Sequence, residues 1–181
     1  MGKRPTDRMP DTSFRVMELL FVIADLIYPH VRRRARSFDI QEGMIVVDYG
    51  CGPGRYTTEF ARIVGESGKV YAIDIHELAI EAVRKKIAKR GIHKVEALLA
   101  HGYNCGLPDA VADVVCAIDM FFGVREPIVF LEELKRITNA DGLLVIDDGH
   151  QSRAKTKEKL LASGCWRIIE ENRDHLKCKM V

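Results

Sequence analysis

An acidic residue followed by alternating glycines stands in the first third of the chain. In the segment VVDYGCGPGRYT, residues 46–57, Asp48 is followed by Gly50, Gly52 and Gly54. Glycines allow a tight turn and a close approach of the backbone to a ligand, and a helix that follows presents unpaired N–H groups. Asp74 ends the next predicted strand, where its carboxylate can accept hydrogen bonds from both hydroxyls of a ribose. Together these features predict a site for a nucleoside-bearing ligand.

The spacing of the glycines separates two classes of ligand. Dinucleotide enzymes carry the pattern G-x-G-x-x-G, whereas the third glycine of this loop comes one position early and Pro53 lies inside the loop. Asp48 would repel a pyrophosphate, but it would attract a ligand that carries an ammonium and a sulfonium group. The loop therefore favours S-adenosylmethionine over a nicotinamide or flavin dinucleotide.

Polar residues also follow two later strands of the predicted sheet. Asp119 follows the predicted strand of residues 114–118. Asp147 ends the next predicted strand, and Asp148 and His150 follow it. Ligands bind at the carboxyl ends of the strands in such sheets, so we expect Asp119, Asp148 and His150 to include the catalytic groups. Histidine titrates near neutral pH, as a general base should, and Asp119 is also placed to contact the methionine end of the cofactor.

Two alternatives remain for these strand ends. Each polar side chain could be a solvated or capping group. The carboxylates could instead hold a divalent cation, but a site without a metal ion is the favoured expectation.

The apolar pattern from Asp39 onward alternates between short continuous runs and longer stretches of helical period. This alternation predicts an α/β fold around a mostly parallel sheet. The predicted strands are residues 44–48, 70–74, 95–100, 114–118, 143–147, 166–169 and 176–180. The predicted helices are residues 55–64, 77–90 and 154–162 and a segment that begins at Pro127. Asp141-Gly142 is expected to turn the chain before residues 143–147.

The N-terminal segment differs from the rest of the chain. Residues 14–28 are apolar on nearly every face of a helix, and Arg32, Arg33, Arg34 and Arg36 follow them. The favoured interpretation is a helix packed over the mouth of the sheet, because a helix that is apolar all round is usually buried. The alternative is an interfacial helix whose basic tail meets anionic lipid, as a peripheral membrane contact, or a phosphate-bearing partner. Residues 1–38 are expected to form a helical extension or lid.

Composition narrows the functional class. The chain has 181 residues and a formal net charge of +2, which fits one globular domain and argues against an obligate nucleic-acid binder. The first residues lack the pattern of a secretory signal, and no uncharged apolar run is long enough to cross a bilayer, so a cytoplasmic location is expected. The five cysteines are widely spaced, which predicts reduced thiols rather than disulfides or a zinc site.

The motifs resemble those of the class I S-adenosylmethionine-dependent methyltransferases. VVDYGCGPG is similar to the first motif of that family, VYAIDIHELAIEAVRKK to the second, and ADVVCAIDMFF and DGLLVIDDGH to its fourth and fifth strands. The resemblance covers Asp39 to the C-terminus, so it implies a methyltransferase domain of residues 39–181 with a three-layer, doubly wound, Rossmann-like fold. It also implies seven strands in the order 3-2-1-4-5-7-6, with strand 7 antiparallel. The small-molecule branch that includes quinone-biosynthesis enzymes is the most similar.

The resemblance also implies which residues hold the cofactor, with Asp74 at the ribose. Many relatives have an Asp just after the third strand to contact the adenine amino group, and Tyr103 occupies that position here. Asn104 or a backbone carbonyl is expected to substitute for it. The predicted cofactor-binding residues are Asp48, Gly50, Gly52, Gly54, Asp74, Ile75, Gly102, Tyr103, Asn104 and Asp119.

The methyl acceptor is expected to be a small and partly apolar molecule. Enzymes that methylate amino groups of DNA or RNA usually have Asp or Asn, two prolines and an aromatic residue at the end of strand four, whereas this chain has Asp119-Met120-Phe121-Phe122. Transfer from a sulfonium is an in-line displacement, so positioning can supply most of the catalysis. The alternatives are a non-catalytic S-adenosylmethionine-binding module or partner subunit and, with less support, an NAD-dependent oxidoreductase.

Overall fold

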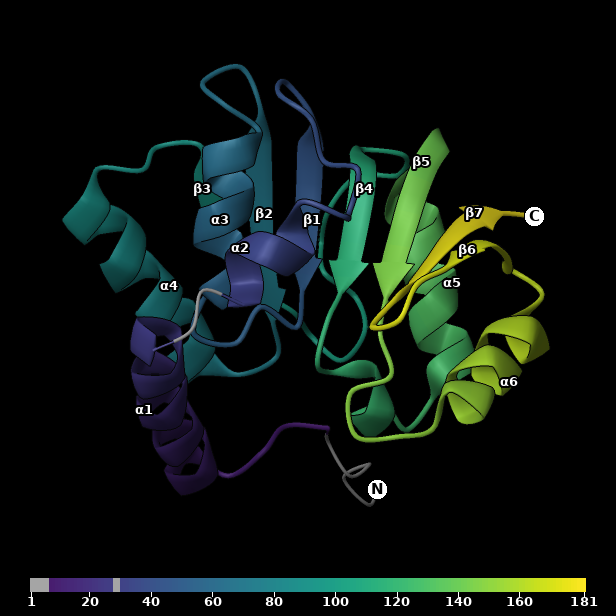
Figure 1. Cartoon of the computed structure of the whole chain (residues 1–181), viewed down its shortest axis with the longest axis horizontal. Helices are drawn as coiled ribbons and strands as arrows, with labels where there is room; N and C mark the ends of the chain where they lie inside the picture. The colour runs from purple at the N-terminus through teal and green to yellow at the C-terminus, as the bar shows by residue number, and fades with distance from the viewer. Residues whose placement is uncertain (1–6, 28–29) are drawn as a thin grey trace.

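The computed structural model describes residues 7–27 and 30–181, and its centre is a seven-stranded sheet (Figure 1). The strand order is β3-β2-β1-β4-β5-β7-β6, in which β1 to β5 run parallel and β7 runs antiparallel to both of its neighbours. The strands are β1 (Ile45–Tyr49), β2 (Lys69–Asp74), β3 (Val95–Leu99), β4 (Ala112–Ala117), β5 (Thr138–Ile146), β6 (Trp166–Glu171) and β7 (Leu176–Met180). The predicted α/β fold and its strand order are confirmed.

Helices cover both faces of the sheet. On one face lie α2 (His30–Ala35), α3 (Arg55–Ile63) and α4 (Glu77–Arg90), and on the other lie α5 (Pro127–Ile137) and α6 (Arg153–Ser163). Each face has its own buried apolar cluster, one containing Phe60 and the other Phe130. A short 3-10 helix, η1 (Phe121–Gly123), follows β4. The carboxyl ends of the parallel strands therefore meet at one edge, between two helical layers.

One turn predicted from the sequence is part of a strand. Asp141 and Gly142 lie inside β5, whose register with β4 shifts between Ala112 and Val114, so that residues of β5 bulge out of the ladder. A Cβ at Gly142 would lie 2.4 Å from Thr138 Cγ2 and 3.0 Å from Ala112 O. The turn prediction is wrong because this glycine permits a close approach within a bulge rather than a reversal of the chain.

The N-terminal extension contains two helices. Helix α1 (Asp11–Ile27) lies on the side of the molecule toward which the arrows of β4 and β5 point (Figure 1), and α2 follows it. Tyr28, the predicted end of the first helix, lies outside the described residues. In the part of the chain that the structure describes, no helix combines the length and the apolar character that crossing a membrane requires.

Helix α1 meets the rest of the protein along one side. Phe14 is buried, and its ring centroid lies 4.5 Å from that of His76. On the opposite side of the helix, Val16, Leu19 and Leu20 are 60%, 62% and 59% exposed. The expected burial of this helix on every side is therefore wrong for the face that carries these three residues.

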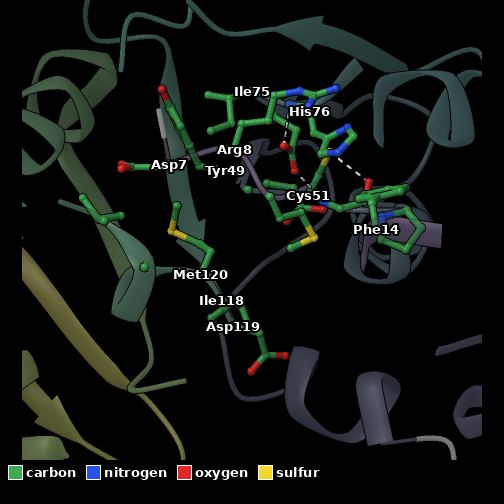
Figure 2. Close-up of a pocket in the computed structure, with 18 of the residues that line it drawn as sticks. Asp7, Arg8, Phe14, Tyr49, Cys51, Ile75, His76, Ile118, Asp119 and Met120 are labelled. Atoms are coloured by element: carbon green, nitrogen blue, oxygen red, sulfur yellow. Dashed lines mark hydrogen bonds between the residues drawn. The ribbon is translucent and has the colours of Figure 1, made fainter. Parts of the chain in front are cut away.

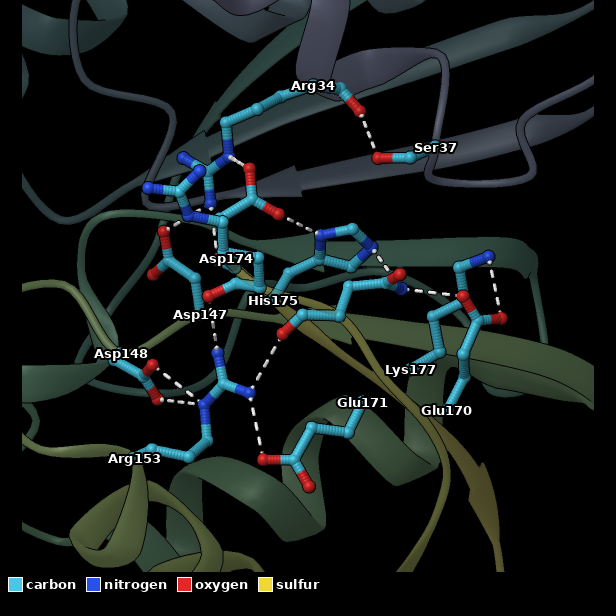
Figure 3. A network of polar contacts seen from close by, with 12 residues as sticks. Arg34, Ser37, Asp147, Asp148, Arg153, Glu170, Glu171, Asp174, His175 and Lys177 are labelled. Atoms are coloured by element: carbon cyan, nitrogen blue, oxygen red, sulfur yellow. Dashed lines mark hydrogen bonds and ion pairs between the residues drawn. The ribbon is translucent and has the colours of Figure 1, made fainter.

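A buried arginine attaches α2 to the edge of the sheet (Figure 3). Arg34 Nη2 lies 2.8 Å from Asp147 Oδ2 after β5, and Nη1 lies 2.9 Å from Tyr56 Oη on α3. Arg34 Nε lies 3.1 Å from Asp174 Oδ2 in the turn between β6 and β7. Since the Arg34 side chain is only 7% exposed, the interpretation as an exposed basic tail is wrong for this residue. Arg36, in contrast, is exposed.

Arg34→Met should destabilise the protein by about 3–5 kcal/mol, because removing one partner of a buried ion pair leaves the other charge uncompensated. Urea denaturation followed by circular dichroism measures the change. Arg36→Met is the matched control, and it should alter the free energy of unfolding by less than about 0.5 kcal/mol because Arg36 is exposed. Equal urea midpoints for the two variants would show that the Arg34 contacts do not stabilise the fold.

Candidate functional site

A cavity of about 340 Å³ opens beyond the ends of β1, β2 and β4, a volume within the range of small-molecule sites. Its wall includes the glycine loop, the end of β2, the loop after β4 and the N-terminal segment. Figure 2 shows Arg8, Ile75 and His76 in the upper part of the view and Ile118 and Asp119 in the lower part. The cavity thus lies where the strand order reverses, which is the usual ligand site of such sheets.

The loop between β1 and α3 is held by backbone hydrogen bonds. The N–H groups of Gly50 and Cys51 donate to Ile73 O on β2, at 2.8 and 3.0 Å. A Cβ at Gly50 would lie 2.7 Å from Met120 Cγ, so the close approach of the loop after β4 requires glycine there. At Gly52 nothing lies within 4 Å of the Cβ position, and the residue lines the cavity. The start of the loop is therefore fixed by hydrogen bonds to β2, and its centre at Gly52 is accessible to a ligand in the cavity.

Asp74 joins the glycine loop to the end of β2. The N–H of Gly52 donates to Asp74 Oδ2 and the N–H of His76 donates to Asp74 Oδ1, both at 2.9 Å. Burial raises the pKa of Asp74, and these two donors counteract that shift. Since a carboxylate oxygen has two lone pairs, Asp74 can hold the loop and still accept hydrogen bonds from ribose hydroxyls.

Asp48 is a buried acid at the glycine loop. Asp48 is 3% exposed, and its Oδ2 accepts a hydrogen bond from Thr57 Oγ1 at 2.5 Å. Burial raises the pKa of Asp48 to about 7; repulsion from Asp74 adds to the shift, and the hydrogen bond from Thr57 opposes it. A cation in the cavity would favour the ionised carboxylate. The pair of acids therefore fits a ligand with a ribose and a cationic end.

The N-terminal segment supplies part of the wall through residues that the sequence analysis did not name individually. Asp7 and Arg8 line the cavity, together with three side chains of α1, namely Phe14, Met17 and Phe21. These three recur at helical spacing, a pattern that predicts one buried face of a helix. That spacing was visible in the sequence, and the helix was expected over the mouth of the sheet, but the spacing does not indicate which residues of the cavity these side chains meet.

Most of the predicted cofactor-binding residues line this one cavity. They are Asp48, Gly50, Gly52, Asp74, Ile75, Gly102, Tyr103 and Asp119. Gly54 lies outside the wall, where a Cβ would approach Val83 Cγ2 to 2.9 Å, so it permits close packing of α3 against α4. Asn104 lines a neighbouring open groove, and its Oδ1 accepts a hydrogen bond from the N–H of Gly106 at 2.8 Å.

The three candidate catalytic residues do not lie together. Asp119 lines the cavity with its side chain 50% exposed, and its N–H donates to Asp147 Oδ1 at 2.8 Å. Asp148 forms an ion pair with Arg153 at 2.7 Å, and His150 packs edge-on against an aromatic ring of η1, with 4.8 Å between the ring centroids. Neither of these two residues is part of the cavity wall. Within residues 7–27 and 30–181, no group of three His, Cys, Asp or Glu side chains is arranged to hold a metal ion.

The doubly wound sheet, the glycine loop and its two acids define a Rossmann-like nucleoside-binding protein. A family profile described as a methyltransferase domain matches residues 40–177. A SAM-dependent methyltransferase of known structure from Aquifex aeolicus is 30% identical, with a TM-score of 0.76 over 83% of this chain and 89% of that one. The chain belongs to this family, the class I S-adenosylmethionine-dependent methyltransferases, and its cofactor is S-adenosylmethionine.

Two curated relatives show how far the similarity extends. A demethylmenaquinone methyltransferase from Geobacillus stearothermophilus is 30% identical over 113 residues, which are 61% of this chain and 47% of that protein. A probable cobalt-precorrin-6B C(15)-methyltransferase (decarboxylating) from Sulfurisphaera tokodaii is 30% identical over 142 residues, 77% of this chain and 69% of that protein. The chain thus spans about half the length of the first relative and about two thirds of the second.

Asp74→Asn should weaken the binding of S-adenosylhomocysteine at least about tenfold, because charge-assisted hydrogen bonds to a ribose contribute about 1.5–3 kcal/mol each. Isothermal titration calorimetry measures the dissociation constant. Asp113→Asn is the control, since Asp113 accepts a hydrogen bond from the N–H of Ile45 at the opposite ends of the strands, and it should leave the constant unchanged. A folded Asp74→Asn protein with unchanged affinity would place the ribose elsewhere.

The affinity for S-adenosylhomocysteine should rise several-fold as the pH is raised from about 5.5 to about 7.5, since Asp48 has a pKa of about 7 and only its ionised form attracts the ammonium group. Below this pKa the carboxyl is protonated and the attraction is lost. Calorimetry across this range measures the effect, and Asp48→Asn should flatten it. Methylthioadenosine shares the ribose and base but lacks the ammonium, so it should depend less on pH. An equal dependence for both ligands would contradict the role of Asp48.

Proposed function

We propose that this protein transfers the methyl group of S-adenosylmethionine to a small, partly apolar molecule. The observation that carries the proposal is one cavity that joins the glycine loop and its two acids to an apolar wall. The apolar side chains come from α1 and from the segment after β4: Phe14, Met17, Phe21, Met120 and Phe122. An acceptor packed against them would lie beside the methionine end of the cofactor.

The residues of the chain would position both reactants. When bound, S-adenosylmethionine supplies an electrophilic methyl group on a sulfonium. In this proposal Asp74 holds the ribose, Asp48 attracts the cationic end, and Asp119 orients the acceptor or takes its proton. The backbone φ of +57° at Asp119 is uncommon for a residue other than glycine, and the hydrogen bond from its N–H to Asp147 supports that conformation.

Asp148 and His150 are proposed to meet only a larger acceptor. His150 packs against the ring of Phe122, and Phe122 lines the cavity. An acceptor that extends past Phe122 would therefore approach His150.

We also propose that residues 1–38 act as a lid on the methyltransferase domain of residues 39–181. Phe14, Met17 and Phe21 line the cavity from α1, where they would shield the displacement from water. The exposed face of α1 with Val16, Leu19 and Leu20 would provide a peripheral contact with lipid for a lipophilic acceptor.

A quinone-type aromatic ring is the acceptor class that we favour. One relative is named for demethylmenaquinone and another for a cobalt-precorrin, and the aromatic and methionine side chains of the wall suit a flat apolar ring. We propose a cytoplasmic location, because all five cysteines are buried and free, as is usual in a reducing compartment.

Incubation with S-adenosylmethionine that carries a deuterated methyl group tests the proposed function. We expect label in a reduced demethylated naphthoquinone and an equal amount of S-adenosylhomocysteine, measured by mass spectrometry. Asp119→Asn should lower kcat about a hundredfold if Asp119 takes a proton, with little change in the affinity for S-adenosylhomocysteine. Asp113→Asn should keep the full rate. A protein that binds S-adenosylhomocysteine but labels neither a naphthoquinone nor a precorrin would favour the non-catalytic module.

A further inference from the structure

Five residues separate the cavity from the open groove beside it. The groove has a volume of about 1050 Å³ and is lined by the end of β3 and by α5. The residues that line both spaces are Asp7, Arg8, Ile75, Gly102 and Tyr103. Among these boundary residues, all of them within the described part of the chain, Asp7 is the one acid, and its side chain is 14% exposed.

A nucleoside held by its ribose at Asp74 would place its base at this boundary. With its cationic end toward Asp48 and the glycine loop, as proposed above, the cofactor would extend its base in the other direction, past Ile75. Strand β3 is the neighbour of β2 on that side, and the segment after β3 carries Gly102 and Tyr103. This placement of the base rests on the proposed function, which assigns the ribose to Asp74 and the cationic end to Asp48.

Adenine carries an amino group that needs a hydrogen-bond acceptor. Two acceptors near the end of β3 each accept one hydrogen bond from the protein: Tyr103 O accepts from Tyr49 Oη at 2.7 Å, and Asn104 Oδ1 accepts from the N–H of Gly106 at 2.8 Å. Both are uncharged oxygens, which form weaker hydrogen bonds than a carboxylate does. Asn104 also lines only the groove. Of the two substitutes expected from the sequence, Asn104 therefore faces the groove rather than the cavity, and a backbone carbonyl would hold the amino group less strongly than an acid would.

The carboxylate of Asp7 has capacity for a further donor. Asp7 Oδ2 accepts from Tyr103 Oη and from the N–H of Arg125, the latter at 3.4 Å. Asp7 Oδ1 lies 3.5 Å from Arg125 Nε. A carboxylate offers about four acceptor positions, so these contacts orient Asp7 without saturating it.

The neighbouring residue holds this part of the chain in place. Arg8 Nε lies 2.9 Å from Glu77 Oε2 at the start of α4, and Arg8 Nη2 lies 2.6 Å from Asp11 Oδ1. Figure 2 shows Asp7 and Arg8 in the upper part of the view with Ile75, away from Asp119. The N-terminal segment therefore presents an oriented acid at the position where the base is expected.

We propose that Asp7 accepts a hydrogen bond from the adenine amino group of S-adenosylmethionine, so that the N-terminal segment selects the base of the cofactor. Hypoxanthine has a carbonyl oxygen in place of that amino group. Its oxygen would face the carboxylate of Asp7, which leaves two acceptors in contact without a proton between them. The protein should therefore discriminate against a hypoxanthine cofactor through a residue outside the domain of residues 39–181.

Calorimetry with S-adenosylhomocysteine and S-inosylhomocysteine on the full chain tests this role. The unmodified protein should bind the adenine compound at least about tenfold more tightly, as expected for a lost charge-assisted hydrogen bond. Asp7→Asn should reduce this preference to less than about threefold, because an amide can donate to the hypoxanthine oxygen. Asp113→Asn is the matched control, an acid that lines neither space and accepts a hydrogen bond from the N–H of Ile45 at the opposite ends of the strands, and it should keep the preference.

Tyr103→Phe provides a second variant that keeps the aromatic ring. It removes the hydroxyl that orients Asp7, so it should reduce the preference for adenine by less than Asp7→Asn does. An unchanged preference for adenine in a folded Asp7→Asn protein would overturn the role of Asp7 and leave the rest of the cofactor site in place. A protein that bound neither compound would overturn the cofactor site and this proposal together.

Discussion

The buried ion pair between Arg34 and Asp147 attaches α2 of the N-terminal extension to the edge of the sheet. Taking both charges out of water costs free energy, so the pair persists only because Tyr56 and Asp174 supply further contacts. Burial and repulsion from Asp119 raise the pKa of Asp147, and Arg34 counteracts this shift. The other oxygen of Asp147 accepts the N–H of Asp119. One carboxylate therefore anchors α2 and also fixes the conformation of the acid that faces the cavity.

The cavity combines two environments that suit different parts of one reaction. Near the glycine loop, the buried Asp48 and the half-buried Asp74 both have raised pKa values, an arrangement that a cationic ligand would compensate. Toward α1 the wall is apolar, and Phe14 closes it by packing against His76. A methyl donor that carries its own positive charge fits the first environment, and an apolar acceptor fits the second.

Residues of one type have different structural roles at different positions of the chain. Gly50 allows Met120, after β4, to approach the glycine loop closely, whereas Gly142 lies within the bulge of β5. Asp119 and His150 both follow parallel strands, yet only Asp119 lines the cavity. Their position along the chain predicted the edge of the sheet, whereas the direction of each side chain depends on packing with η1 and α6 that the strand pattern does not encode.

The sequence by itself determined the alternation of strands and helices, the glycine loop and the placement of Asp74 at the end of a strand, because apolar runs and glycine spacing act within a few residues of chain. The order of the strands came from the resemblance of the motifs to a known family. Only the tertiary structure decided that Asp7 meets Tyr103 and that Arg34 is buried rather than exposed. These contacts join segments that are distant in sequence. Periodicity indicates that a helix has a face to bury, but the surface that it meets is selected by shape and charge in the folded protein.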